Sequence, residues 1–332
     1  MESNHSRRQF LKTMSLSAAA IMVGRAVPAL GVRHQTGNSP AGNAPAAPKP
    51  LPRRILGKTG VPVSVLALGG EARIERRHYL PFGGADAIIN RALDLGINYI
   101  DTSAWYGQGT SERNIGRVLQ SRRGEVFLAT KSHERSYDGT MRLAEQSLNN
   151  LRTDTIDLYQ VHDVRTHEQL DLILSQRGAL RAMERLRDEG VVRYIGITGH
   201  WDPEVLLRGI RDYPFDAILL SLNAADIHYN PFQTKLLETA IDQNLGILAM
   251  KVFAKGRLLA PNGKIELRQA LGYVLSFPVS SAVVGISSIA ELEQDVQIAT
   301  TEESPYSTEE MTRIEELAFS GARDGNWFKK QT

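Results

Sequence analysis

Four side chains in this 332-residue chain have the types needed to deliver a proton to a carbonyl oxygen: Asp101, Tyr106, Lys131 and His162. A tyrosine hydroxyl, with an ordinary pKa near ~10, is a weak acid at neutral pH. A neighbouring ammonium group favours the phenolate, so we expect Lys131 to lower the pKa of Tyr106 toward the working range. Asp101 would hold Lys131 in place by pairing with it. A neutral His162 would orient the substrate oxygen through a hydrogen bond.

The four residues lie at or just after the ends of three consecutive strand-like segments, 97–100, 126–130 and 156–161. Taken singly, each has an ordinary explanation, such as a cap, a rim aromatic, a solvated lysine or a strand-end histidine. Four matching types on three consecutive strand ends favour a shared site instead. In a barrel of parallel strands, all carboxyl ends point to one face, so side chains far apart in sequence converge there.

Strand-like and helix-like segments alternate along the rest of the chain, which predicts a parallel sheet. The expected strands are 65–68, 97–100, 126–130, 156–161, 194–197, 217–220, 247–250 and 281–284. The expected helices are 86–95, 111–120, 141–151, 178–189, 203–210, 232–243, 265–276 and 289–298. Eight of each predict an α/β fold, a single (β/α)8 TIM barrel formed by residues 51–332.

Two additions to the barrel are expected. An N-terminal β-hairpin, formed by Arg54–Gly57 and Val61–Ser64 around Lys58-Thr-Gly, would plug the barrel bottom. An extra C-terminal helix, 308–319, opens with a capping box, because Ser307 is followed three residues later by Glu310. Ser111 is the expected N-cap of helix 111–120.

The run from Asp101 to Gly116 reads Asp-Thr-Ser-x-x-Tyr-Gly-x-Gly-x-Ser-Glu-x-x-Ile-Gly. It resembles the signature of the aldo-keto reductase superfamily, and the resemblance extends from about residue 54 to residue 318. It implies that Asp101, Tyr106, Lys131 and His162 are a catalytic tetrad. It also implies reduction of a small-molecule aldehyde or ketone by NAD(P)H, with Tyr106 as proton donor. The alternative is a cofactor-binding redox sensor or regulatory partner subunit on the same barrel.

The chain has no phosphate-binding G-x-G-x-x-G after its first strand, although Gly69 and Gly70 follow that strand. The superfamily instead binds an extended nicotinamide dinucleotide with the loops after the later strands, and the matching segments are 251–256 and 285–288. The residues that the resemblance assigns to the cofactor are Asn223, Lys251, Phe253, Lys255, Gly256, Gly285, Ser287, Ser288, Glu291 and Asp295. Two positions depart from the commoner pattern. Thr198-Gly199-His200 replaces a Ser-Asn pair, and Leu219 replaces a glutamine.

Glu291 lies at or near the position where members that prefer NADPH commonly have an arginine, so we expect a weak preference for NADH. Trp105 and His200 are the expected walls of the substrate pocket. The basic cluster Arg73, Arg76, Arg77 and His78 is either a solvated loop or a mouth that attracts anions. His133, Asp163 and His167 lack a metal-ligand spacing, so no metal is expected.

Composition narrows the function classes. A net charge of +2 gives no case for nucleic acid as a partner, and the absence of cysteine excludes disulfides, a thiol nucleophile and thiolate-bound metal. A chain with 42% hydrophobic and 23% charged residues has an ordinary globular composition.

The first 29 residues have the pattern of a twin-arginine (Tat) signal peptide. Arg7 and Arg8 precede an apolar run, 14–24, which is too short to remain as a membrane span after cleavage. Residues 30–50, rich in Pro, Ala, Gly and Asn, are expected to form a flexible linker. The expected partner is therefore the Tat export machinery, and the expected location is the periplasm.

Overall fold

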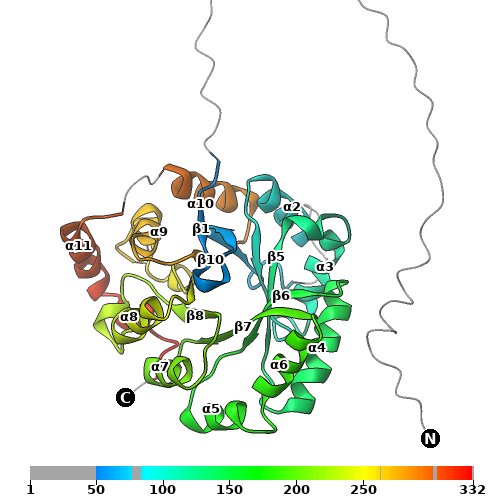
Figure 1. The fold of residues 1–332 in the computed structure, drawn as a ribbon. Coiled ribbons are helices and arrows are strands. Elements are labelled where there is room, and N and C mark those ends of the chain that lie inside the picture. Colours follow the sequence, from blue (N-terminus) through cyan, green and yellow to red (C-terminus); the bar gives the residue numbers. More distant parts are fainter. Residues whose placement is uncertain (1–49, 77–83, 262, 302–304, 331–332) are drawn as a thin grey trace, which may run out of the picture. The chain divides into compact units, whose positions relative to one another are not determined.

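The structure, a computed structural model, describes residues 50–76, 84–261, 263–301 and 305–330. Within these residues eight parallel strands close into a barrel in the order β10-β3-β4-β5-β6-β7-β8-β9. Helices surround the barrel (Figure 1). The predicted (β/α)8 fold is therefore confirmed. The segments expected to be a signal peptide and most of the linker lie outside the described residues.

The barrel strands agree with the predicted segments to within a few residues, and one of them, β6, has the predicted bounds. They are β3 Leu66–Gly69, β4 Tyr99–Asp101, β5 Phe127–Ser132, β6 Ile156–Val161, β7 Val192–Gly199, β8 Ala217–Ser221, β9 Gly246–Met250 and β10 Ser281–Gly285. The last strand closes the barrel on the first, with Ala282 opposite Leu66 and Gly285 opposite Gly69.

Nine helices match the predicted ones. They are α2 Ala85–Asp94, α3 Thr110–Arg122, α4 Tyr137–Leu151, α6 Ala179–Asp188, α7 Pro203–Asp212, α8 Lys235–Asp242, α9 Leu267–Ser276, α10 Ile289–Thr301 and α11 Thr308–Phe319. Two helices were not predicted, α5 His167–Leu174 and the short α12 Ala322–Gly325. Helix α5 lies in the long connection between β6 and α6 and begins at a capping residue, Thr166, whose side chain accepts from the Gln169 N–H.

The predicted N-terminal hairpin is present as β1 Arg53–Ile55 and β2 Pro62–Ser64, joined through the 3-10 turn η1 Gly57–Thr59. Its buried side chains Leu56 and Val63 pack into the barrel interior together with Ala67, Tyr99 and Phe127. The Lys58 N–H donates to the carbonyl oxygen of Asn244, just before β9 begins. The hairpin therefore closes the amino-terminal end of the barrel, as expected, and leaves the carboxyl end open for a site.

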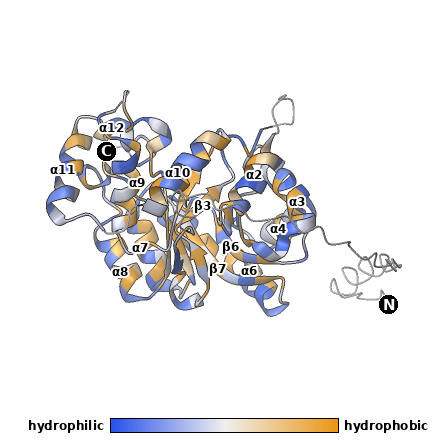
Figure 2. Cartoon of the chain, turned by 90° about the horizontal axis from the view of Figure 1, so that it is seen from above, coloured by the Kyte–Doolittle hydropathy of each residue, from blue (hydrophilic) through white to orange (hydrophobic). Residues whose placement is uncertain are grey.

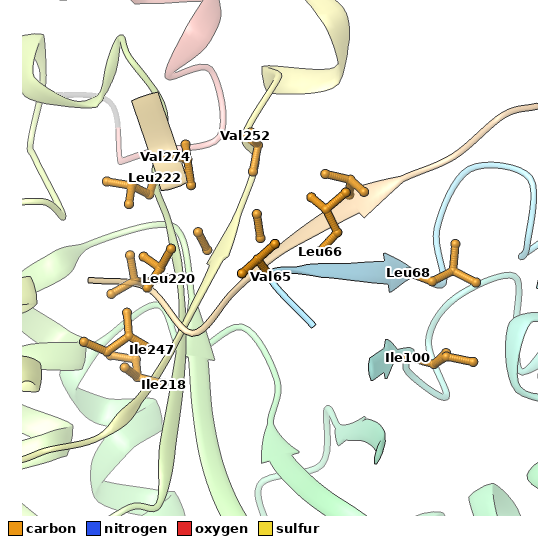
Figure 3. Packing of buried hydrophobic residues seen from close by; sticks show 14 of the residues in the cluster. Val65, Leu66, Leu68, Ile100, Ile218, Leu220, Leu222, Ile247, Val252 and Val274 are labelled. Carbon is orange, nitrogen blue, oxygen red and sulfur yellow. The ribbon is translucent and has the colours of Figure 1, made fainter. Parts of the chain in front are cut away.

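A second, larger core lies between the strands and the helices. Leu68, Ile100, Ile218 and Ile247 point outward from their strands into this layer (Figure 3). Viewed from above, the central strands are largely hydrophobic, whereas the surrounding helices carry both hydrophobic and hydrophilic residues (Figure 2). Burial of this apolar layer stabilises the barrel and fixes which side chains of each strand face inward.

The start of helix α11 was predicted correctly, and the start of helix α3 was not. Helix α11 begins with the predicted capping box, in which Ser307 and Glu310 each accept from the other's backbone N–H. Helix α3 begins earlier than predicted, because its N-cap is Gly109 and not Ser111. The hydroxyl of Ser111 is instead 2.7 Å from that of Thr102 and ties α3 to the end of β4.

Beyond α11 the chain crosses to the carboxyl end of the barrel. Lys329 is fully buried there and pairs with Asp226 in the 3-10 turn η3 Asp226–His228. The Lys330 N–H donates to the carbonyl oxygen of Trp201. In the part of the chain that the structure describes, no helix has the length and apolarity needed to cross a membrane.

Candidate active site

The carboxyl ends of β4, β5 and β6 bring the four predicted residues together. Lys131 Nζ donates to Asp101 Oδ1, to the Thr102 carbonyl oxygen at 2.8 Å and to the Tyr106 hydroxyl at 3.4 Å. The ring of Tyr106 meets the ring of His162 edge to face, with 5.7 Å between centroids. The convergence follows from strand alternation, because Asp101 and Lys131 both point into the barrel at its open end.

The Asp101–Lys131 pair is almost fully removed from solvent, with side-chain exposures of 3% and 1%. A buried charge is tolerated only when it is paired and hydrogen-bonded. Gln160 meets part of this requirement by donating from Nε2 to Asp101 Oδ2 at 3.0 Å. Gln160 was not predicted, although it stands two residues before His162 on the same side of β6.

His162 is held by a hydrogen bond between its Nδ1 and the Ser103 hydroxyl at 3.0 Å. Burial lowers the pKa of His162 well below its usual value, and the ammonium of Lys131 lowers it further. The ring is therefore neutral at physiological pH. A neutral ring with Nδ1 engaged leaves Nε2 for another partner.

The pKa of Tyr106 differs from the prediction. Burial raises it well above its ordinary value, and the carboxylates of Glu71, Asp101, Glu75 and Asp163 raise it further. The predicted lowering by Lys131 is therefore not found, because desolvation and the surrounding negative charges outweigh one ammonium group. The phenol holds its proton firmly in this structure.

A cavity of about 460 Å³ opens beside Asp101 and Tyr106. It extends to Ser287 and Glu291 at the start of α10, and Leu219 and Met250 also line it. An extended dinucleotide needs such a channel between a reacting end and a helix N-terminus that receives phosphate. The residues present therefore fit a nicotinamide dinucleotide.

Most of the residues that the resemblance assigned to the cofactor line this cavity. These are Lys251, Phe253, Lys255, Gly256, Gly285, Ser287 and Glu291. Three do not line it. Asn223 is buried and binds the backbone of Lys251 and Ala225, whereas Ser288 accepts from the Glu291 N–H. The third, Asp295, lies buried one turn further along α10.

The loop after β9 has an unusual backbone. Lys251, Ala254 and Lys255 all have positive φ angles, of 62°, 47° and 57°. Left-handed conformations at non-glycine residues cost about 1–3 kcal/mol each and are typical of ligand clamps. The amino groups of Lys251 and Lys255 both lie 3.9 Å from Glu71 Oε2, across the cavity in the loop after β3.

Glu71 was not predicted as a site residue, because the arginines in the loop after β3 suggested a basic surface there. Of the predicted basic cluster, Arg76 lines the cavity, and Arg73 donates its N–H to the Ile286 carbonyl oxygen. Arg77 and His78 lie outside the described residues. The loop therefore presents the carboxylates of Glu71 and Glu75 to the cavity as well as a cation.

The start of α10 carries two carboxylates of different character. Glu291 accepts a hydrogen bond from the Ser287 N–H at 2.8 Å and is half-buried. Asp295 is buried, and neither of its carboxylate oxygens has a hydrogen-bond partner among the described residues. Burial and the charge of Glu291 raise the pKa of Asp295 to about 7.

Trp105 and His200, the predicted pocket walls, both lie at the mouth. The Trp105 ring contacts the His133 ring at 5.0 Å between centroids, and His200 contacts Phe328 of the C-terminal tail at 5.5 Å. Burial lowers the pKa of His200 to about 4. Phe328 was not predicted, because nothing in the tail sequence shows that it returns to the barrel mouth.

A barrel with an Asp–Lys–Tyr–His group beside this cavity has the architecture of a carbonyl oxidoreductase. Residues 66–268 match the Aldo/keto reductase family. An uncharacterized oxidoreductase of Bacillus subtilis is 28% identical, and the alignment covers 74% of this chain and 90% of that protein. L-galactose dehydrogenase of Arabidopsis thaliana is 26% identical, with 82% and 96% covered. The holo form of an aldo-keto reductase from Bacillus halodurans superposes with a TM-score of 0.67 and 26% identity, covering 80% of this chain and 96% of that one.

The family match spans more than half of the chain, so the protein belongs to the aldo/keto reductase family. It is a nicotinamide-dependent oxidoreductase that acts on the carbonyl group of an aldehyde or ketone.

Proposed function

We propose that Tyr106 is the proton donor of this reductase and that Asp101, Lys131 and His162 complete its catalytic group. The observation that supports this most directly is the contact of Lys131 Nζ with both Asp101 and the Tyr106 hydroxyl. Asp101, Lys131 and His162 then have defined roles in the reaction of one atom, the carbonyl oxygen of the substrate.

A substrate carbonyl placed between Tyr106 and His162 accepts hydrogen bonds from the phenol and, in the tautomer in which the Ser103 hydroxyl donates to Nδ1, from the Nε2–H of the neutral imidazole. When bound, a reduced nicotinamide supplies the hydride to the carbonyl carbon. The alkoxide that forms takes the proton of Tyr106. The ammonium of Lys131 stabilises the resulting phenolate, and Asp101 and Gln160 fix the position of that ammonium.

The raised pKa of Tyr106 keeps this proton in place until negative charge develops on the substrate oxygen. Proton transfer then becomes favourable, because the developing alkoxide is a much stronger base than the starting carbonyl. A phenol poised in this way delivers its proton in the transition state and does not lose it to solvent beforehand.

The substitution Tyr106→Phe tests the role directly. We expect kcat to fall by about 10²–10⁴-fold, the usual contribution of general acid catalysis, with the fold and the Kd for cofactor retained. A variant that reduces a good aldehyde at the wild-type rate excludes Tyr106 as the acid. A wild-type protein that binds cofactor but consumes none across an aldehyde panel instead favours the sensor or regulatory subunit.

The same proposal includes the residues that bind the cofactor and the choice between NADH and NADPH. Lys251, Lys255 and the N-terminus of α10 hold the phosphates of the cofactor, and NADH is accepted at least as well as NADPH.

The protein is exported to the periplasm by the Tat machinery, which is supported by Arg7, Arg8 and the apolar run that follows them. Because that route carries folded proteins, the barrel would leave the cytoplasm with its cofactor already bound.

A further inference from the structure

The C-terminal tail, residues 320–330, is fixed to the open end of the barrel at several points. Asn326 is buried and donates from Nδ2 to the Ala225 carbonyl oxygen at 2.8 Å. Lys329 is also buried, and its Nζ pairs with Asp226 and donates to the Tyr229 carbonyl oxygen at 2.8 Å. Breaking a buried ion pair of this kind is strongly unfavourable. The tail is therefore a fixed support beside the segment that follows β8.

The loop after β9, residues 251–257, needs such a support. It lines the cofactor cavity with residues that include Lys255 and Gly256. Three successive residues of this loop, Ala254, Lys255 and Gly256, have left-handed φ angles of 47°, 57° and 82°. This conformation is unfavourable for the two that are not glycine, and it persists only where the surroundings hold it. The contacts made by the loop therefore decide how well it keeps its shape around a cofactor.

The tail and the segment that follows this loop are closely packed. A Cβ atom added to Gly325, the last residue of α12, would lie 2.8 Å from Leu258 Cδ2. Leu258 is itself buried. Because there is no room for a side chain at Gly325, α12 lies directly against the chain just beyond the loop.

Trp327 extends this contact to the loop itself. The centroid of its six-membered and five-membered ring system lies 4.9 Å from the Arg257 guanidinium and 5.8 Å from the Lys255 ammonium. A cation near an aromatic face is attracted by the ring, and most strongly when the ring is tryptophan. The buried Phe328 ring meets the Trp327 ring edge to face at 5.7 Å between centroids. Trp327 is therefore braced by the fixed tail and placed against two cations of the loop.

These contacts lie outside the cofactor cavity. Neither Trp327 nor Arg257 is among the residues that line that cavity. Arg257 instead lines a separate hollow of about 490 Å³, together with Asp324 of α12 and with Lys255 and Gly256. Because Lys255 and Gly256 line both spaces, the loop separates the cofactor cavity from the tail. The tail can therefore affect a bound cofactor through the loop, without touching it.

We propose that Trp327 is a positioning residue for the cofactor: it anchors the loop after β9 to the fixed tail and so slows dissociation of the bound nicotinamide dinucleotide. This rests on the proposed function, in which Lys251 and Lys255 hold the phosphates of the cofactor. Release of those phosphates requires the loop to move, and the loop moves only when it leaves Trp327. Slow release also suits a protein that would be exported with its cofactor already bound.

Dissociation is measured without turnover. The protein is loaded with NADH or NADPH, an excess of the oxidised cofactor is added, and the loss of fluorescence of the bound reduced form gives the dissociation rate. We expect Trp327→Ala to release the cofactor about 5- to 30-fold faster than the wild type, the range expected for two cation–aromatic contacts near the surface. Trp327→Phe keeps a weaker aromatic face and should give a smaller increase.

Arg257 tests the same contact from the loop. Arg257→Gln removes one cation without changing a residue that lines the cavity, and it should also speed dissociation. Arg257→Lys keeps the positive charge and should restore much of the slow release. In the double variant Trp327→Ala/Arg257→Gln, the increase should be smaller than the product of the two single increases, because both changes remove the same contact.

Two matched controls separate this contact from general effects on the tail. Phe319→Ala removes an exposed aromatic ring at the end of α11, which contacts His228 and not the loop. Arg323→Gln removes the charge of an exposed arginine on α12. Both variants should release the cofactor at the wild-type rate.

The outcomes separate this proposal from the proposed role of Tyr106. Wild-type dissociation rates in Trp327→Ala and Arg257→Gln, in a protein that reduces aldehydes, overturn the role of Trp327 and leave the reductase intact. Faster dissociation in both variants, combined with full activity of Tyr106→Phe, supports the role of Trp327 and contradicts that of Tyr106. Equally fast dissociation in the two controls overturns the proposal, because the specific contact would then have no effect of its own. A wild type that binds neither NADH nor NADPH contradicts both proposals.

Discussion

The ammonium of Lys131 is 3.4 Å from the hydroxyl of Tyr106 and pairs at the same time with the buried carboxylate of Asp101. One cation therefore connects the stability of the barrel mouth to the chemistry proposed there. Thr102 and Gln160 complete the arrangement by binding Lys131 and Asp101 respectively.

Replacing Lys131 with methionine should affect stability and catalysis together. Removing one partner of a buried ion pair leaves the other charge uncompensated, which typically costs about 3–5 kcal/mol. We expect a loss of this order in urea unfolding of Lys131→Met, together with a large fall in kcat. Adding Asp101→Asn should recover part of the stability but none of the activity. Full activity in Lys131→Met would show that the ammonium has no part in proton transfer.

The convergence of Asp101, Lys131 and His162 was predictable from the sequence because it follows from barrel topology. Asp101, Lys131 and His162 each mark the end of a strand, and the carboxyl ends of barrel strands meet at one face. The eight-strand closure and the hairpin plug were predictable for a similar reason, since hydrophobic periodicity and turn residues are local signals. Gln160 could have been predicted in the same way, because it lies two residues before His162 on the same face of β6.

What could not be predicted depends on burial and on contacts between distant segments. The direction of the Tyr106 pKa shift is set by desolvation and by carboxylates that include Glu71 and Glu75 in the loop after β3 and Asp163 in the loop after β6. The return of Phe328 to His200 depends on the burial of Lys329 against Asp226, which no local pattern encodes. The N-cap of α3 was misplaced because Ser111 is a good capping residue that has another partner, Thr102.

Asp295 should make the protein less stable as the pH rises. The unfolded chain loses this proton near the ordinary aspartate pKa of 3.8, whereas the folded protein keeps it until about pH 7. Stability is therefore lost between these two values as pH increases, at roughly 1.4 kcal/mol per pH unit. Asp295→Asn has no proton to lose, so we expect it to unfold at higher urea than the wild type at pH 8, with a much smaller difference at pH 4.5.

The dependence of stability on pH below about 6.5 provides a control. His162 and His200 have lowered pKa values, so folding is penalised as the pH falls below the ordinary histidine value of ~6.5 and the unfolded state takes up protons. This histidine contribution is the same in both proteins, so the difference between their stabilities over this range reports Asp295 alone. An Asp295→Asn advantage that is the same at pH 5 and pH 8 would contradict the raised pKa.

Export should depend on the arginine pair near the N-terminus. Changing Arg7 and Arg8 to lysine keeps the charge but removes the guanidinium groups of the proposed Tat signal. We expect full-length protein to remain in the cytoplasm with its activity intact, measured by fractionation and immunoblotting. A shortened form that still reaches the periplasm in wild-type amounts would remove the Tat proposal.

The choice between NADH and NADPH should depend on the charge of Glu291. Its carboxylate lines the cavity at the start of α10, where the helix N-terminus would otherwise attract a phosphate. A 2′-phosphate at ~4 Å from this carboxylate meets a repulsion of roughly 4 kcal/mol at an effective dielectric of about 20. The free ribose hydroxyls of NADH instead donate hydrogen bonds to it, as they do to acidic residues in other NAD-selective proteins. We expect kcat/KM to favour NADH or to differ little between the two cofactors.

Two substitutions separate the charge of Glu291 from its structural role. Its Oε2 accepts the Ser287 N–H at 2.8 Å, and glutamine can accept the same bond without the charge. Glu291→Gln should therefore shift the kcat/KM ratio toward NADPH while leaving the Tm unchanged. Glu293→Gln is the matched control, because it removes the same charge from the same helix at a residue whose side chain pairs with Arg91. A wild-type preference for NADPH above about tenfold, worth ~1.4 kcal/mol, would contradict the prediction. It would indicate that Lys251 and Lys255 bind the 2′-phosphate of NADPH.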